Sequence, residues 1–179
     1  MNILAISGSL RAASTNTALL RALADAAPEG MEITLCEKIG QLPIFSPDLE
    51  GPLRPPIVAE FAAQIAAAEA LIIACPEYVH ALPGGFKNAI DWLVSGSEII
   101  AKPIFLAQAT SRGKDVLADL QRVLGTVSER FYPSPMLCVP LLSKTPEDIA
   151  KHVQDPQIRA EIDLFLDAVC RAVMAQEVD

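Results

Sequence analysis

The residues best suited to chemistry gather first in a short segment near the N-terminus. Residues 8–17 read Gly-Ser-Leu-Arg-Ala-Ala-Ser-Thr-Asn-Thr, so hydroxyls, an amide and one guanidinium directly follow an apolar run. Such groups donate to phosphate oxygens, and Arg11 supplies the full positive charge that a dianion needs. An ordinary capped helix start is the alternative, because Ser14, Thr15 and Asn16 are all favoured N-cap residues. The presence of Arg11 after a strand favours a phosphate site over a plain cap.

The same segment lacks the motifs that bind larger phosphate ligands. It contains no G-x-G-x-x-G for a dinucleotide and no G-x-x-x-x-G-K-[ST] for a nucleoside triphosphate. A monophosphate is therefore the simpler ligand. The two histidines, His80 and His152, have no metal-ligand spacing between them or with cysteines, so no metal site is predicted.

A second candidate segment covers residues 75–85, Cys-Pro-Glu-Tyr-Val-His-Ala-Leu-Pro-Gly-Gly. Pro76 and Pro83 stiffen it, because each ring fixes one backbone dihedral angle. A stiff loop with Tyr78 and free main-chain N–H groups suits the edge of a flat heteroaromatic ring. The segment therefore complements a phosphate site with a place for a ring.

Apolar periodicity predicts the elements that position these segments. Strands are expected at residues 2–7, 32–36, 70–75, 103–107 and 136–139, with helices at 19–27, 57–68, 83–93, 116–127 and 156–173. This alternation predicts an α/β fold with helices on both faces of a parallel sheet. Five strands favour a flavodoxin-like three-layer sandwich with strand order 2-1-3-4-5. The proline-rich stretch at 43–56 is interpreted as a surface excursion, so residues 1–179 are expected to form one domain.

Composition limits the partners of the chain. Its 179 residues are 51% hydrophobic, and 14 basic against 22 acidic residues give a net charge of −8, which argues against nucleic acid and anionic membranes. The most membrane-like window, 57–75, is interrupted by Glu60, Gln64 and Glu69. Four cysteines without a C-x-x-C motif, and an N-terminus without a basic flank, predict a cytoplasmic protein with reduced thiols.

The two segments together resemble a known family. The motifs that carry the likeness are Gly8-Ser9-Leu10-Arg11 with Ser14 and Asn16, then Pro76-Glu77-Tyr78, and Pro83-Gly84 through Lys87-Asn88-Ala89-Ile90-Asp91-Trp92. They resemble the NADPH-dependent FMN reductase family, which includes azoreductases, quinone reductases and chromate reductases. The likeness runs from Asn2 to Val139 and implies a flavodoxin-like domain that holds FMN tightly.

The resemblance also implies a role for individual residues. The FMN phosphate would be held by Ser9, Arg11, Ser14, Thr15 and Asn16, and the isoalloxazine would lie along Pro76, Glu77, Tyr78 and Val79, with Thr110 and Ser111 touching it. Glu77 is expected to act through its backbone. The family commonly has Asn where this chain has Val79, and the segment 109–114 is shorter and poorer in glycine than usual. Both departures concern the surroundings of the ring and the choice of substrate.

The implied activity is that of an FMN-dependent NAD(P)H oxidoreductase with a ping-pong scheme. NADPH or NADH would be the donor, and a quinone, azo compound, free flavin or metal oxyanion the acceptor. No catalytic side chain is predicted, because the flavin carries the chemistry. A homodimer or homotetramer is expected to cover the ring. A flavodoxin-type electron carrier and a flavin-free scaffold are the alternatives.

Overall fold

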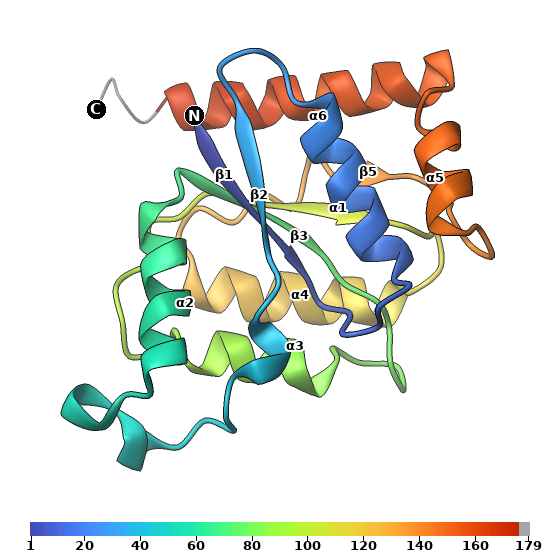
Figure 1. Ribbon diagram of the computed structural model, residues 1–179. Coiled ribbons are helices and arrows are strands. Elements are labelled where there is room, and N and C mark those ends of the chain that lie inside the picture. The colour runs from blue at the N-terminus through green and yellow to red at the C-terminus, as the bar shows by residue number, and fades with distance from the viewer. Residues whose placement is uncertain (176–179) are drawn as a thin grey trace.

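A five-stranded parallel sheet lies between two layers of helices in the computed structural model, which describes residues 1–175 (Figure 1). The strands are β1 (Asn2–Ser7), β2 (Glu32–Cys36), β3 (Ala70–Ala74), β4 (Ile104–Gln108) and β5 (Leu137–Cys138). The helices are α1 (Thr15–Ala26), α2 (Pro56–Ala67), α3 (Gly84–Asp91), α4 (Lys114–Val127), α5 (Pro146–His152) and α6 (Pro156–Met174). The strand order β2-β1-β3-β4-β5 confirms the predicted topology.

The central strands are apolar throughout because both of their faces are covered. In β1, Ile3 and Ala5 pack into a core shared with α1, α5 and α6, whereas Leu4 and Ile6 pack into a second core shared with α2, α3 and α4. Successive side chains of a strand point to opposite faces, so a strand between two helix layers must be apolar at every position. All five residues of β3 and of β4 are buried.

Parallel pairing brings the carboxyl ends of the strands to one edge of the sheet. Ser7 of β1 lies opposite Ala74 of β3, and Gln108 of β4 lies opposite Cys138 of β5. The loops that follow β1, β3 and β4 therefore leave from the same edge. Ligands of doubly wound sheets bind at this edge, beside the point where the strand order reverses.

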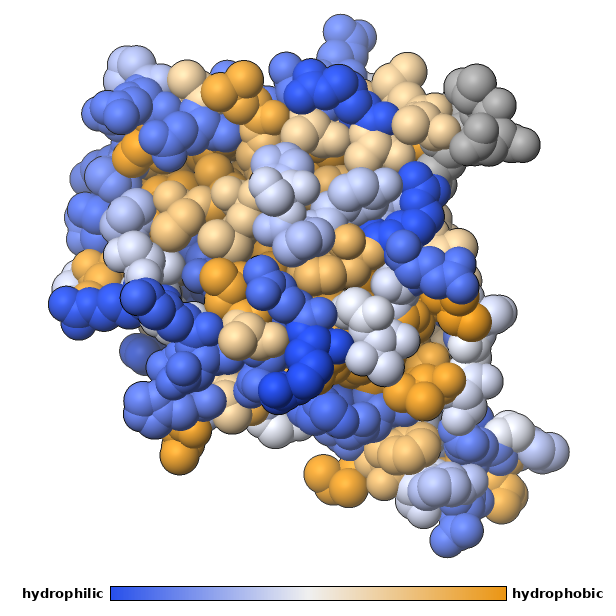
Figure 2. All heavy atoms as spheres, turned by 180° about the vertical axis from the view of Figure 1, so that it is seen from behind, coloured by the Kyte–Doolittle hydropathy of each residue, from blue (hydrophilic) through white to orange (hydrophobic). Residues whose placement is uncertain are grey.

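Two regions differ from the periodicity-based prediction. The helix α5 was not predicted, because Ile149 is its only buried residue and no apolar stripe marks it. Local polar bonds define it instead: Thr145 and Asp148 form a capping box. The proline-rich stretch contains short 3-10 turns at 47–49 and 51–53 and follows another at 39–41. It projects at the lower right of Figure 2 with polar and apolar side chains mixed. No helix within residues 1–175 has both the length and the apolar character needed to cross a bilayer.

Helix α3 fixes this excursion to the body of the protein. The Asn88 amide donates to the Pro43 carbonyl at 2.9 Å and accepts from the Phe45 N–H at 2.8 Å. The indole N–H of Trp92 donates to the same carbonyl at 2.8 Å, and its ring packs edge-on against Phe45. With 1% of its surface exposed, Trp92 belongs to the core. These bonds thus attach the excursion to α3, whose own buried residues Phe86, Ala89 and Ile90 pack in the core.

The substitution Asn88→Ala tests this attachment. It leaves the half-buried Phe45 N–H without its acceptor, so the free energy of unfolding should fall by about 1–3 kcal/mol. Urea denaturation measures the change. Gln121→Ala, on the exposed face of α4, is the control and should stay within about 0.5 kcal/mol of the parent. Equal effects of the two substitutions would contradict the attachment.

Candidate functional site

The first loop, which follows β1, leads into helix α1, and Ser14 caps the start of this helix. The Ser14 hydroxyl accepts from the Thr17 N–H at 3.2 Å, and the Ser14 carbonyl accepts from the Ala18 N–H at 2.9 Å. The capped start that the sequence left open as an alternative is therefore present. The N–H groups of Thr15 and Asn16 precede the first intrahelical bond, so the helix itself gives them no acceptor. A cap and an anion site are compatible here.

Hydroxyl groups fold the rest of the first loop over this helix start. The Thr17 hydroxyl donates to the Ser7 hydroxyl at 2.8 Å, and Ser7 accepts from the Ser9 N–H at 3.3 Å. The Ser9 hydroxyl accepts from the Arg11 N–H at 3.4 Å. Sequence reasoning missed Ser7, although a hydroxyl at the end of an otherwise apolar strand was the available signal.

A glycine is required where the first loop crosses the end of β3. The Gly8 N–H donates to the Ala74 carbonyl at 2.8 Å. A Cβ atom on Gly8 would lie only 2.4 Å from the Cys75 sulfur, so no larger residue fits without displacing the second loop. Burial raises the pKa of Cys75 to about 12, so its thiol stays protonated at neutral pH. Cys75 therefore serves as packing.

The electrostatics of the first loop suit an anion. Arg11 is exposed, and the first turn of α1 carries no acidic residue. A cavity of about 470 Å³ adjoins the loop and is lined in part by Ser9, Arg11 and Thr17. The same cavity is also lined by Arg21 and Glu37, which pair with each other at 3.4 Å, so Arg11 is the lining cation that this carboxylate does not neutralise. The donor set thus fits the phosphate of FMN.

The second loop ends in a turn whose two central residues have left-handed backbone conformations. Tyr78 and Ala81 exchange two backbone hydrogen bonds of 3.1 Å, while Val79 has φ 52° and His80 has φ 57°. These values describe a type I′ turn, which favours Asn and Gly and disfavours a β-branched residue. Val79 is 95% exposed, so no packing compensates for its conformation. The β-branched Val79 therefore places strain at the tip of the turn.

Glu77 joins the second loop to the third. One of its carboxylate oxygens accepts from the N–H groups of both Asp115 and Val116, each at 3.1 Å, in the first turn of α4. Gly113, with φ 99°, occupies the N-cap position and offers no side chain to these donors. Glu77 therefore caps α4 from a different loop. Its carboxylate has a structural role, beyond the backbone role that the sequence suggested.

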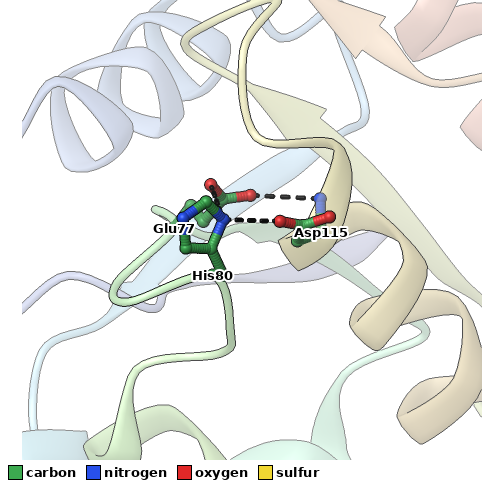
Figure 3. A group of neighbouring side chains, drawn as sticks. All are labelled: Glu77, His80 and Asp115. Carbon is green, nitrogen blue, oxygen red and sulfur yellow. Dashed lines mark hydrogen bonds and ion pairs between the residues drawn. The ribbon is translucent and has the colours of Figure 1, made fainter.

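His80 and Asp115 add a second link between the same loops (Figure 3). The His80 Nδ1 donates to the Asp115 carboxylate at 2.6 Å and lies 3.8 Å from the other oxygen of Glu77. The hydrogen bond and negative charge of Asp115, followed by the charge of Glu77, raise the pKa of His80. Sequence reasoning did not identify Asp115, because only the fold brings it to His80.

The third loop, which joins β4 to α4, contributes polar groups at the same edge of the sheet. The Thr110 hydroxyl accepts from the Arg112 N–H at 3.0 Å, and Ser111 is exposed. The side chain of Gln108, at the end of β4, is 5% exposed, and its Nε2 finds no hydrogen-bond partner within residues 1–175. An orphaned donor at this depth is costly unless a ligand or water meets it.

The predicted site residues occupy three loops of this one edge. Ser9, Arg11, Ser14, Thr15 and Asn16 lie in or just after the first loop, Pro76, Glu77, Tyr78 and Val79 lie in the second, and Thr110 and Ser111 lie in the third. Direct bonds connect the first loop to the end of β3 through Gly8, and the second to the third through Glu77. Asn16 is 7% exposed and Ser14 is 5% exposed, so these two offer little side-chain surface.

Residues 1–139 match the sequence family of NADPH-dependent FMN reductases. The chain belongs to this family. The match confirms the family that the two motifs predicted. FMN and NAD(P)H are the cofactors of that family, so they are the ligands with which the geometry of the three loops is to be compared.

Curated relatives have related names. An NAD(P)H-dependent FMN reductase of Pseudomonas aeruginosa is 44% identical over 92 residues, which cover 51% of this chain and 49% of that protein. A quinone reductase of Escherichia coli K12 is 35% identical over 116 residues, which cover 63% of this chain and 61% of the reductase. The matched region therefore spans less than two thirds of either relative.

Solved structures share the fold. FerB, a flavoenzyme NAD(P)H:(acceptor) oxidoreductase from Paracoccus denitrificans, has a TM-score of 0.71 at 22% identity, covering 93% of this chain and 95% of its own. RosB with bound 8-demethyl-8-formylriboflavin-5'-phosphate has a TM-score of 0.72 at 16% identity, covering 99% of this chain and 81% of its own. At these identities the likeness establishes the flavodoxin-like fold.

The capping role of Glu77 can be measured directly. Glu77→Ala leaves two N–H groups of α4 without an acceptor and should lower the free energy of unfolding by about 1–2 kcal/mol, the usual effect of losing a cap. Glu77→Gln keeps an oxygen acceptor and should lose less. Chemical denaturation reports both changes, and Glu129→Ala, at an exposed position, is the control. If the Gln variant loses as much as the Ala variant, the hydrogen bonds are not the cause.

Proposed function

We propose that residues 1–179 form one FMN-binding domain that passes two electrons from NAD(P)H to a small-molecule acceptor by a ping-pong scheme. The observation that carries this proposal is the start of α1. It combines free N–H groups, hydroxyls and Arg11 with no acidic residue in its first turn, at the edge where three loops meet. Family membership supports the cofactor, and the geometry supports its placement.

In this proposal the first loop holds the phosphate. Arg11 supplies the charge, Ser9 a hydroxyl, and Thr15 and Asn16 their main-chain N–H groups, while Ser14 contributes by fixing the helix start. When bound, FMN supplies hydride transfer in both halves of the reaction. The chain itself binds and orients the reactants.

The second and third loops orient the ring. Pro76, Glu77, Tyr78 and Val79 would border one edge of the ring, and Thr110 and Ser111 would contact it from the third loop. The Glu77 cap holds these loops at a fixed separation. A fixed separation reduces the ordering needed when the ring binds.

A quinone is the acceptor class that we favour. Relatives of this chain are named quinone reductase and 2-hydroxy-1,4-benzoquinone reductase, the latter from a Burkholderia species and 40% identical over 92 residues. An azo compound, free flavin and a metal oxyanion are further candidates. The family match does not favour the electron-carrier and scaffold alternatives, because the family is named for NADPH-dependent reduction.

A homodimer or homotetramer is part of the proposal. Large apolar side chains are exposed beside the proposed ring site, with Leu10 at 58%, Tyr78 at 45% and Val79 at 95%. A second copy of the chain would remove such surface from water and shield the ring. Sedimentation velocity measures the assembly.

One experiment separates the proposal from its alternatives. Protein loaded with FMN should lose its flavin absorption when NADPH is added under anaerobic conditions, without any other protein. Arg11→Ala should weaken FMN binding at least tenfold, because a charge-assisted hydrogen bond contributes about 1.5–3 kcal/mol. Calorimetry measures the affinity, and Arg171→Ala on α6 is the control. A colourless protein that takes up no FMN would refute the function.

A further inference from the structure

Quinone reduction needs a proton that the cofactor ligands do not obviously provide. A quinone that takes up two electrons and one proton as a hydride equivalent is left as the monoanion of a hydroquinone. A second proton must reach the remaining oxygen. Among the residues assigned to the ring, the prolines, Val79 and the hydroxyls of Thr110 and Ser111 are poor acids, and the Glu77 carboxylate accepts hydrogen bonds from α4. Tyr78 and His80 are the remaining groups of the second loop that could donate a proton, and the choice between them rests on the proposed function.

We propose that His80 is the proton donor to the acceptor. Its Nε2–H would donate to the acceptor oxygen, while Nδ1–H remains bonded to Asp115. The residue stands at the tip of the second loop, beside the residues assigned to the ring. It is thus a catalytic residue in a reaction for which the sequence alone predicted none.

The geometry prepares the imidazole for this role. The Nδ1 is bonded to Asp115 at 2.6 Å, which fixes the ring and leaves Nε2 without that anchor (Figure 3). The side chain is 82% exposed, so a molecule arriving from solvent reaches it. Val79 and His80 both have left-handed backbones, and Val79 is 95% exposed, so the tip of this turn faces solvent.

The surrounding charges favour the protonated imidazole. Asp115, from the first turn of α4, and Glu77, from the same loop, are the charged groups that face His80, at 2.6 and 3.8 Å. Both are acidic and raise the pKa of His80 above its ordinary value, so more of the imidazole carries the proton at a given pH. A general acid must carry its proton when the acceptor arrives.

The proton step balances without another reactant. The hydride equivalent originates from NAD(P)H, which becomes NAD(P)⁺. The Nε2–H bond of the imidazolium breaks, an O–H bond forms on the hydroquinone monoanion, and the electron pair stays on Nε2. Water at the exposed ring then returns a proton to Nε2. The sum is NAD(P)H, quinone and one proton giving NAD(P)⁺ and hydroquinone.

The first test compares two acceptors in the FMN-loaded protein. Benzoquinone must take up protons when it is reduced, whereas ferricyanide accepts one electron at a time and takes up no proton. His80→Gln should lower kcat with benzoquinone roughly 100-fold, the lower end of the range for a positioned general acid, and leave the ferricyanide rate unchanged. His152→Gln, at the histidine on α5, is the control and should leave both rates unchanged. A quinone-specific loss in Tyr78→Phe, with none in His80→Gln, would overturn the proposal.

The second test measures the proton itself. The sequence contains two histidines, so His152→Gln leaves His80 as the sole imidazole in an NMR titration. Asp115→Asn should lower the pKa of His80, since it removes the main cause of the upward shift. The rate with benzoquinone should fall at high pH as His80 loses its proton. In Asp115→Asn the alkaline limb of this pH–rate profile should therefore move to lower pH by as much as the pKa of His80 falls. A limb that stays in place while the pKa moves would overturn the role.

These outcomes are distinct from a failure of the proposed function. If NADPH does not bleach the FMN-loaded parent protein, the oxidoreductase proposal itself is wrong. If bleaching is normal in His80→Gln and both acceptors slow equally, the substitution has disturbed the loop, and His80 is not the donor. Loss of the benzoquinone rate alone supports the proposal.

Discussion

The carboxylate of Glu77 determines how the carboxyl edge of the sheet is organised. Helix α4 begins at Lys114 behind a glycine with no side chain, so its first N–H groups depend on an acceptor from elsewhere. Glu77 provides that acceptor from the loop after β3. Because one carboxylate serves two donors, it joins the loop after β3 to the start of α4. The link of His80 to Asp115 connects the same two segments.

The first loop shows how an acidic protein can attract an anion. The chain carries a net charge of −8, yet residues 8–17 contain Arg11 and no acidic residue. Salt screens distant charges beyond about 8–10 Å, so the local donors dominate the field that a phosphate would meet. For the binding of a phosphate, the absence of acidic residues from residues 8–17 matters more than the net charge of the chain.

Much of the fold could be predicted because the apolar residues of the strands show which of them are buried. The run from Ala70 to Ala74 is apolar at every position, which is typical of a strand covered by helices on both faces. Ser14 as a cap was likewise a local property. Helix α5 lacked any apolar stripe, and its capping box is recognisable only beside a helix that is already expected.

The site was predictable only in its outline. Motifs placed the three loops at one edge, but no spacing indicates that His80 meets Asp115, 35 positions later in the chain. The structural role of the Glu77 side chain was hidden for the same reason, since its partners belong to another element. Pairings between loops arise from topology, which a linear pattern does not encode.

The turn at Val79 has a consequence for the stability of this protein. Left-handed geometry costs a non-glycine residue about 1–2 kcal/mol, and an exposed β-branched side chain recovers none of it. The whole molecule therefore loses stability at a position whose methyl groups face only water.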